Sequence, residues 1–297
     1  MSEGRRPLRV AFTSDLHVEY HLEVVGLVAE RVQALKPDVL VLAGDVCPDL
    51  HRLERVLRLL SKSLPGPLLY LPGNHELWCG GAGSSGPHSR ARYEELLPTL
   101  ARRAGALPLG GKPQRVADVT FVGVMGWYDF SLRDPDLEAA LGPVDYQGER
   151  GDRTAVDRQQ VHWPDDAGQP ITDVQLSERM VADLQGQIAA VGPGPVVAVT
   201  HMLPHRWLLD PPGGQRAPNP ALRALDAFMG SDALWEAISR CPGVRLAIAG
   251  HHHEAVAVDL PAGDRSVPCV VSPIGYPREI REDLASHVAD RVVVREI

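Results

Sequence analysis

Polar residues with metal-binding side chains recur in short clusters along this sequence. Three clusters in the first half are 15-DLH-17, 44-GD-45 and 73-GNHE-76, and each comes at the end of a short apolar run. Two later clusters, Thr200-His201 and 250-GHHH-253, also end apolar runs. Carboxylates, carboxamides and imidazoles are the oxygen and nitrogen donors that suit first-row divalent metals. A fold that gathers these clusters would hold metal ions able to activate water and phosphate.

The spacing inside the clusters has a physical logic. Asp15 and His17 are two residues apart, so an extended backbone would turn both side chains to one side, where they could hold one ion. His251 and His253 repeat this spacing, and His252 is then expected to point the other way. Asp45 stands alone, so we expect its two carboxylate oxygens to bridge between the two pairs.

Gathering the clusters requires a sheet, and the apolar runs predict one. Strand-like runs alternate with segments of helical periodicity, which indicates βαβ units with helices packed on a sheet. Sites in such sheets form at the carboxyl ends of the strands, so the clusters should meet at one edge. The predicted strands cover 8–15, 38–45, 67–73, 119–130, 195–201 and 244–253, and the predicted helices cover 21–36, 49–62 and 173–191. The runs 255–260, 268–276 and 291–297 are expected to form consecutive antiparallel strands.

The complete set resembles the calcineurin-like metallophosphoesterase superfamily in every motif and in the same order. The motifs are D15-x-H17, G44-D45, G73-N74-H75-E76, His201 and G250-H251-x-H253. The resemblance covers almost the whole chain. It implies an α/β fold with mixed sheets, arranged as a four-layer αββα sandwich. It also implies hydrolysis of a phosphomonoester or phosphodiester by attack of a metal-bridging hydroxide.

The resemblance further implies a role for each motif residue. His75 would face the phosphate beside Asn74 and act as the proton donor. The expected cofactors are two divalent ions, of manganese, iron or zinc, with manganese favoured. Two such ions bring about +4 and two aspartates remove about 2 of it, which leaves enough positive charge to attract a phosphate. One ion would be held by Asp15, His17, Asp45 and His253, and the other by Asp45, Asn74, His201 and His251.

Other residues near the motifs have simpler expected roles. His252 is expected to support a neighbouring ligand, while His205 could lie either near the pocket or away from it. Cys47 and Cys79 are expected to pack as small apolar residues. The remaining histidines, His21, His51, His88, His162 and His287, are expected to have structural or surface roles. Core packing is the simpler role for each of Trp78, Trp127, Tyr128, Trp163 and Trp207, but as a group they could wall a pocket or stack a base.

Length and composition indicate the organisation of the chain. Its 297 residues, 44% of them hydrophobic, are expected to form one domain over 1–297. The polar insertion at 131–178 and the loop at 80–90 are expected to form a substrate-facing cap or rim. Four scattered cysteines, no signal peptide and no membrane-spanning run predict a cytoplasmic protein, and the oligomeric state is not indicated.

Differences between these motifs and those of known subgroups of the superfamily narrow the range of expected substrates. The stretch 44-GDVCPDL-50 lacks the Asp-Arg-Gly of serine/threonine phosphatases, and Pro48 stands where purple acid phosphatases have tyrosine. His75 stands where lipid A-pathway pyrophosphatases have arginine. A small phosphoester or nucleotide is therefore the expected substrate, and a non-catalytic scaffold is rejected because every motif residue is present.

A nuclease that acts on DNA or RNA ends is the alternative function. The net charge of −8 and the absence of a Lys/Arg run give no sign of an extended nucleic-acid surface. Basic residues that could still contribute to one lie in the insertion, at Arg150, Arg153 and Arg158.

Overall fold

Two mixed β-sheets form the centre of the molecule in a computed structural model that describes residues 6–80, 85–137, 146, 156–212 and 223–297. The first sheet has five strands in the order β11-β1-β2-β3-β4. Its strands run parallel except β11, which is antiparallel to β1. They are β1 (Arg9–Thr13), β2 (Val39–Ala43), β3 (Leu68–Leu71), β4 (Leu107–Pro108) and β11 (Val293–Glu296).

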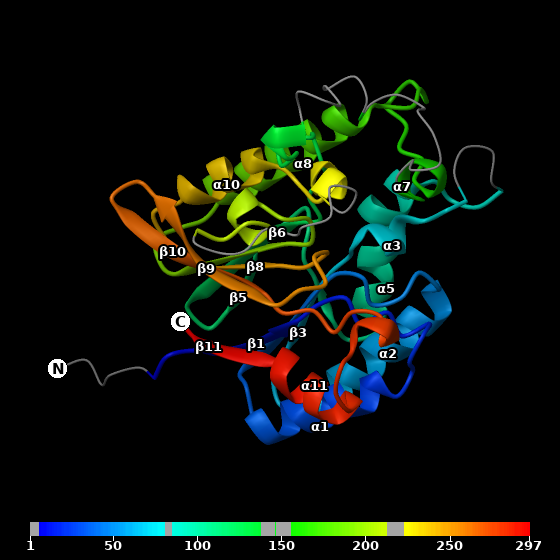
Figure 1. Cartoon of the computed structure of the whole chain (residues 1–297). Helices are drawn as coiled ribbons and strands as arrows, with labels where there is room; N and C mark the ends of the chain where they lie inside the picture. Colours follow the sequence, from blue (N-terminus) through cyan, green and yellow to red (C-terminus); the bar gives the residue numbers. More distant parts are fainter. Residues whose placement is uncertain (1–5, 81–84, 138–145, 147–155, 213–222) are drawn as a thin grey trace.

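The second sheet has six strands in the order β5-β6-β7-β8-β10-β9. The four central strands are parallel, while β5 and β9 pair antiparallel at the two edges. The strands are β5 (Gln114–Val116), β6 (Val119–Val124), β7 (Val196–Thr200), β8 (Val244–Ala249), β9 (Val256–Ala262) and β10 (Arg265–Val271). Parallel strands of both sheets therefore deliver their carboxyl ends to one side of the molecule (Figure 1).

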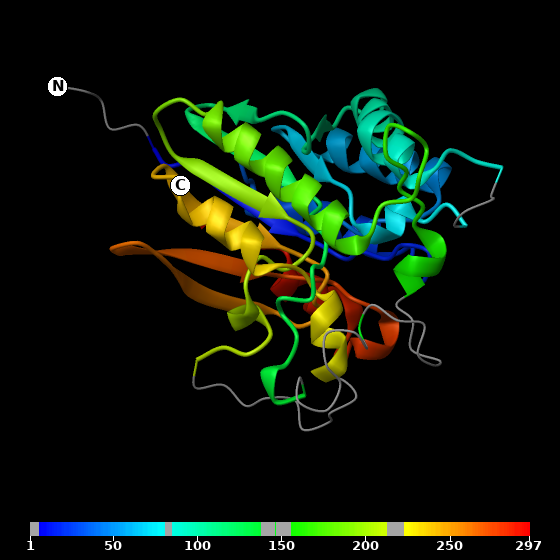
Figure 2. The ribbon, with the colours of Figure 1, turned by 90° about the horizontal axis from the view of Figure 1, so that it is seen from above.

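The two sheets pack face to face, with helices on their outer faces. Phe12 and Val41 of the first sheet share a buried apolar cluster with Phe121 and Ile248 of the second. The first sheet is covered by α1 (Val24–Leu35), α2 (Leu50–Ser63), α5 (Leu97–Arg103) and α11 (Leu284–Arg291), and the second by α8 (Asp173–Ala189) and α10 (Asp232–Ser239) (Figures 1 and 2). This arrangement confirms the predicted αββα sandwich.

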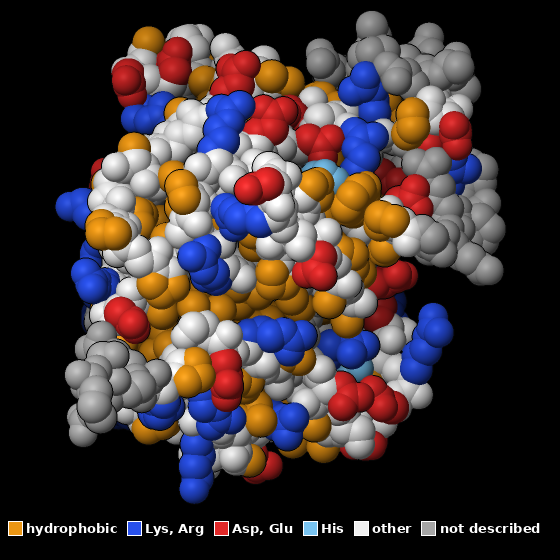
Figure 3. Space-filling model, turned by 90° about the vertical axis from the view of Figure 1, so that its left-hand side faces the viewer, with side chains coloured by type: hydrophobic (Ala, Val, Ile, Leu, Met, Phe, Trp, Pro, Cys, Tyr) orange, Lys and Arg blue, Asp and Glu red, His pale blue; other side chains and the backbone are white. Residues whose placement is uncertain are grey.

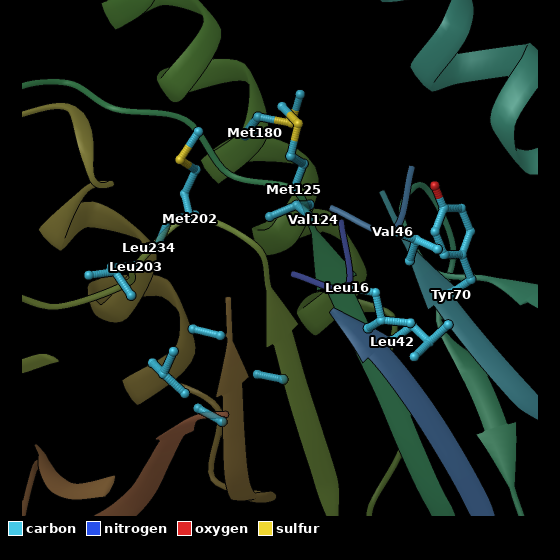
Figure 4. Close-up of a cluster of buried hydrophobic side chains, with 14 of the residues drawn as sticks. Leu16, Leu42, Val46, Tyr70, Val124, Met125, Met180, Met202, Leu203 and Leu234 are labelled. Atoms are coloured by element: carbon cyan, nitrogen blue, oxygen red, sulfur yellow. The ribbon is translucent and has the colours of Figure 1, made fainter. Parts of the chain in front are cut away.

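A second apolar cluster fills the space between the sheets and the helices. Figure 4 shows part of it, where Tyr70 of β3 and Met125, just after β6, are both labelled. The helices present apolar faces to this cluster: on α2, Leu53, Leu57 and Leu60 are buried while the rest of the helix is largely polar. The Asp49 side chain caps α2 by accepting a hydrogen bond from Arg52 N–H at 2.7 Å.

Short helical segments lie in the connections between these elements. The α-helical ones are α3 (Asn74–Leu77), α4 (Ser89–Ala91) and α7 (Val156–Gln160). The others are η1 (Arg92–Leu96), η2 (Arg206–Leu208), η3 (Ala224–Phe228) and η4 (Pro277–Glu279). None of the helices in the described ranges has both the length and the apolar character needed to cross a membrane.

The predicted strands lie where the structure has strands, but two expectations, about where the strands end and how the last strand pairs, were wrong. First, β1 ends at Thr13 and β8 at Ala249, so the motif residues that follow them lie in loops and not on the strands. Second, β9 and β10 pair antiparallel as expected, but β11 does not continue them. It pairs with β1 in the other sheet because α11 comes between β10 and β11 and lies against α1, on the outer face of the first sheet.

The polar insertion is described only in part. Its described residues include α7 and the first turns of α8, where Thr172 and Gln175 form a capping box. Residues 138–145 and 147–155, with Arg150 and Arg153, lie outside the described ranges, as do residues 81–84 of the predicted rim loop. The single domain over 1–297 and the substrate-facing rim stay predictions.

Candidate metal centre

Every predicted motif residue lies at the carboxyl ends of five parallel strands: β1, β2 and β3 in the first sheet, and β7 and β8 in the second. Their side chains form three overlapping groups, in each of which the possible ligand atoms lie within 4.8 Å of one another. Asn74 adds its amide, since its Oδ1 lies 2.9 Å from His201 Nε2. The groups are Asp15–His17–His253, His17–Asp45–His75 and Asp45–His201–His251.

The backbone is left-handed and not extended at four of the motif positions. Asp15, His17, Asp45 and His251 have φ angles of 53°, 42°, 52° and 65°. Residues other than glycine rarely adopt this region, and each such position costs about 1–3 kcal/mol. The expected pairing of Asp15 with His17 is therefore observed, but the extended-backbone reason for it was wrong. Tight loops turn these side chains toward the site, and hydrogen bonds from Asp15 N–H to Gly44 O (2.9 Å) and from His17 N–H to Asp45 O (3.0 Å) hold the loops together.

Glycines allow the two sheets to approach each other at the site. A methyl group on Gly44 would overlap the His201 ring, and one on Gly73 would overlap the Asp45 carboxylate. The His201 ring is fixed in this space because its Nδ1 lies 2.8 Å from Ala43 O. The glycines before Asp45 and Asn74 are therefore required by close packing at the metal centre.

Glu76 fixes the loops that carry Asp45 and Asn74. Its buried carboxylate accepts hydrogen bonds from the backbone N–H groups of Asp45 (3.1 Å), Cys47 (2.8 Å) and Gly73 (2.6 Å). Burial, followed by the charge of Asp45, raises the pKa of Glu76 to about 8. Glu76 belongs to one of the sequence motifs, but no role was predicted for it. A glutamate three residues after a helix N-cap is nevertheless a known capping signal.

The electrostatics of the site favour positive charge. Burial alone would raise the pKa of Asp45, but the charges of His201, His75 and His17 outweigh burial and hold that pKa well below its usual value. Although burial opposes it, Asp45 in turn raises the pKa of His201 to about 10. Asp15 acts in the same way on His253, whose pKa rises to about 9. Two buried carboxylates thus create a negative potential that a cation would satisfy.

The donor atoms also fit metal ions in geometry. His17 Nε2 and His253 Nε2 lie 3.1 Å apart. Two nitrogens bound at about 2.1 Å to one ion lie about 3 Å apart when the angle between them is near 90°. Among the described residues, His17 Nδ1 and His75 Nδ1 are buried without a hydrogen-bond partner. Nitrogen and oxygen donors in this arrangement suit divalent first-row metals.

Residues that no motif indicated also contact the site. Tyr276 stacks on His17 with ring centroids 4.3 Å apart, and its hydroxyl lies 3.5 Å from His75 Nε2. Glu279 Oε2 lies 2.8 Å from His253 Nδ1. Asp157 of α7 accepts hydrogen bonds from the Asn74 and Trp78 side chains. These residues come from the insertion and from the loop after β10, where no local sequence pattern marks them.

The aromatic candidates differ in position. Trp78 lies in the site, stacked on His75 with ring centroids 3.7 Å apart. Trp127 and Tyr128 are buried in the core, and Trp207 lies against His205. Among the described residues, no ring contact joins Trp127, Tyr128 or Trp207 to a motif histidine.

The other histidines and two cysteines lie outside the three ligand groups. His205 caps η2 by accepting a hydrogen bond from Trp207 N–H, and His252 Nε2 lies 3.9 Å from Glu254. His21 and His287 are buried against the carbonyl oxygens of Leu16 and Ile274. Cys47 and Cys79 are buried, and burial raises the pKa of the Cys47 thiol to about 12.

Comparisons with known proteins identify the family. The calcineurin-like phosphoesterase family model matches residues 8–255. The crystal structure of phosphopantetheinyl hydrolase (PptH) from Mycobacterium tuberculosis is similar over 98% of this chain and 96% of that chain, with a TM-score of 0.69 and 20% identity. A dimetal phosphatase from Danio rerio matches with a TM-score of 0.46 and 14% identity, over 90% of this chain and 87% of that chain. No curated protein matches this chain.

At 20% identity the M. tuberculosis structure shows a shared fold, and the family model shows the relationship. Its match spans most of the sequence and contains all the motif residues at the strand ends. This chain therefore belongs to the calcineurin-like phosphoesterase family, and its clustered aspartates and histidines are suited to bind metal for phosphoester hydrolysis.

Proposed function

We propose that this phosphoesterase works with two divalent metal ions that share Asp45, and that manganese is the favoured ion. The observation that carries the proposal is the position of the Asp45 carboxylate. Its Oδ1 lies 3.4 Å from His201 Nε2, while its Oδ2 lies 4.0 Å from His17 Nε2. The two oxygens therefore face different ligand groups, as a bridging ligand requires.

The ligand groups support a division into two positions. When bound, a pair of divalent ions lowers the pKa of a water molecule and neutralises charge on a phosphoryl group. Asp15 is aimed into the site by hydrogen bonds from His251 N–H, which lies 3.1 Å from both carboxylate oxygens. One position would use Asp15, His17, Asp45 and His253, and the other Asp45, Asn74, His201 and His251.

His75 would serve as the general acid that protonates the leaving oxygen. It is the second residue of α3, directly after Asn74, and its backbone N–H donates to Asp45 Oδ1 at 3.0 Å. The residue is 7% exposed, its ring contacts Trp78 and the Tyr276 hydroxyl, and its Nε2 lies 3.7 Å from Asp45 Oδ2, so it faces the ligand groups. Two other roles are open to it: a protonated imidazole that holds the phosphate, or a metal ligand, because it also belongs to the His17–Asp45–His75 group.

The His75→Ala variant separates these roles. A general acid contributes about a hundred- to ten-thousandfold in rate, and most where the leaving alkoxide is basic. We therefore expect a loss of this size on alkyl phosphoesters, a much smaller loss on p-nitrophenyl esters, and two metals still bound by elemental analysis. Equal losses on both esters would favour the holding role, and loss of a metal would make His75 a ligand. Unchanged rates would remove it from the mechanism.

A small phosphoester or nucleotide is the substrate class that we propose. The net charge is −8, and Arg158, which alone of Arg150, Arg153 and Arg158 lies in the described ranges, is already paired with Asp173 at 3.0 Å. The molecular face at the left of Figure 1, which lies on the side away from α3 and α7, mixes acidic, basic and hydrophobic side chains (Figure 3). The acidic net charge and the pairing of Arg158 do not favour a nuclease.

A hydrolysis screen with added manganese tests the substrate class. It would compare phosphomonoesters, phosphodiesters, cyclic nucleotides and single-stranded DNA at equal concentration. A phosphopantetheinyl-carrying protein belongs in the panel because the M. tuberculosis neighbour is named for that hydrolysis. We expect the highest kcat/KM on a small ester, and a preference for DNA or RNA ends would overturn this expectation.

A further inference from the structure

A buried carboxylate of the polar insertion contacts residues of the metal centre. Asp157 lies on α7, is 7% exposed, and accepts two hydrogen bonds at the same oxygen. Its Oδ1 lies 2.9 Å from Asn74 Nδ2 and 2.8 Å from Trp78 Nε1. The end of α7 is also anchored to the chain after Trp78, because Cys79 N–H donates to Gln160 O at 2.9 Å.

The first of these hydrogen bonds decides which end of the Asn74 amide faces the site. An amide binds a cation through its oxygen, whereas its NH₂ group only donates hydrogen bonds. A carboxylate oxygen accepts, so Asp157 draws the NH₂ group toward itself. Asn74 Oδ1 is left facing His201 Nε2 at 2.9 Å, in the Asp45–His201–His251 group. Without Asp157 the amide could rotate and turn its NH₂ group toward that position.

The second hydrogen bond holds the Trp78 indole ring, on which the His75 ring stacks. The Trp78 indole stacks on the His75 ring with an angle of 27° between their planes. Holding the indole N–H restrains the indole plane, and through it the His75 ring. One side chain therefore restrains both a proposed metal ligand and the proposed general acid.

We propose that Asp157 is a positioning residue that orients Asn74 toward the metal ions and couples the insertion to the metal centre. This inference rests on the proposed two-metal function. The role of Asp157 is comparable to that of carboxylates that hydrogen-bond to metal ligands and orient them. Loss of such a carboxylate typically costs about 10- to 100-fold in metal affinity or activity.

The test is manganese binding by isothermal titration calorimetry, with thermal unfolding of each variant measured in parallel. In Asp157→Ala we expect one of the two Mn²⁺ ions to bind about 10- to 100-fold more weakly. Asp157→Asn keeps an acceptor oxygen at the same place, so it should restore most of that affinity. Trp78→Phe keeps the stacking but loses the indole N–H, so its two Mn²⁺ affinities should stay near those of the unsubstituted protein.

Asp173→Ala is the matched control. Asp173 also accepts an indole N–H, from Trp127 at 2.9 Å, and lies in the same insertion, but in the described part of the chain its side chain bonds to Trp127 and Arg158 and to no motif residue. This variant should lose thermal stability and keep both manganese affinities. If Asp157→Ala binds both ions normally, or if both alanine variants lose affinity in proportion to lost stability, Asp157 has only a structural role. If the unsubstituted protein binds fewer than two ions, the proposed function fails instead.

Discussion

The two halves of the metal centre both contain histidines, but two of these histidines differ in how they are held. We call Asn74, His201 and His251 the inner half, and Asp15, His17 and His253 the outer half, and Asp45 is the ligand that we propose they share. In the inner half the His201 side chain is fully buried and fixed to a backbone carbonyl. In the outer half the His253 side chain is 18% exposed, and its Nδ1 lies against Glu279, which is itself 35% exposed. The comparison teaches that similar ligands can be supported differently, by a backbone carbonyl in one half and by a partly exposed carboxylate in the other.

Removing the shared ligand should have the largest effect, because it acts on both halves. We expect Asp45→Ala to lower kcat by at least about a thousandfold, since several kcal/mol of metal-derived stabilisation would be lost. Elemental analysis of manganese-loaded protein should find close to two ions in the unsubstituted protein and fewer than one in the variant. Asp38→Ala is the control, because Asp38 pairs with Arg6 near the start of β2, away from the motif residues. Full metal content in Asp45→Ala would show that the halves do not share a ligand.

Replacing one histidine in each half should separate the two positions. We expect His253→Ala to lose the outer ion and keep a tightly bound inner ion. His251→Ala should lose the inner ion and keep the outer one, which a chelator should remove faster because the His253 side chain is 18% exposed whereas that of His201 is fully buried. The measurement is metal content during timed dialysis against a chelator, and in the unsubstituted protein it should fall in two steps. Equal rates of loss from both variants would contradict the difference between the halves.

We expect the smallest effect from replacing Glu279, which contacts His253 of the outer half. Glu279→Gln keeps the shape of the side chain but removes the charge beside His253 Nδ1. Because such an outer carboxylate orients its histidine, we expect about 10-fold weaker manganese binding at one position only. A titration should show the tighter inner ion unchanged. Weakening of both ions to the same extent would mean that the halves are not independent.

The family resemblance of the motifs predicted the sandwich, and local patterns along the sequence predicted that the motifs would meet at the strand ends. Apolar runs such as 67–71 end abruptly in glycine and polar residues, so strand ends and donor residues could be located together. The glycines before Asp45 and Asn74 were visible in the motifs. The structure gives their reason as close contact, of Gly44 with His201 of the other sheet and of Gly73 with both Asp45 of its own sheet and His201.

Other features could not be read from sequence because they depend on distant contacts. Asp157 is 83 residues from Asn74, and Glu279 is 26 residues from His253. The last strand joins the first sheet only because α11 returns the chain there. The left-handed loops at Asp15 and His251 also contradict a local preference, which tertiary hydrogen bonds override.

The left-handed backbone at four motif positions has an evolutionary consequence. Asp15, His17, Asp45 and His251 sit in a conformation that glycine and asparagine tolerate better than aspartate or histidine. A lineage released from selection for hydrolysis would be expected to accumulate glycine or asparagine there first and to become more thermostable as it lost activity. In this chain the Asp and His side chains at these four positions are therefore held at a cost of about 1–3 kcal/mol each in backbone strain.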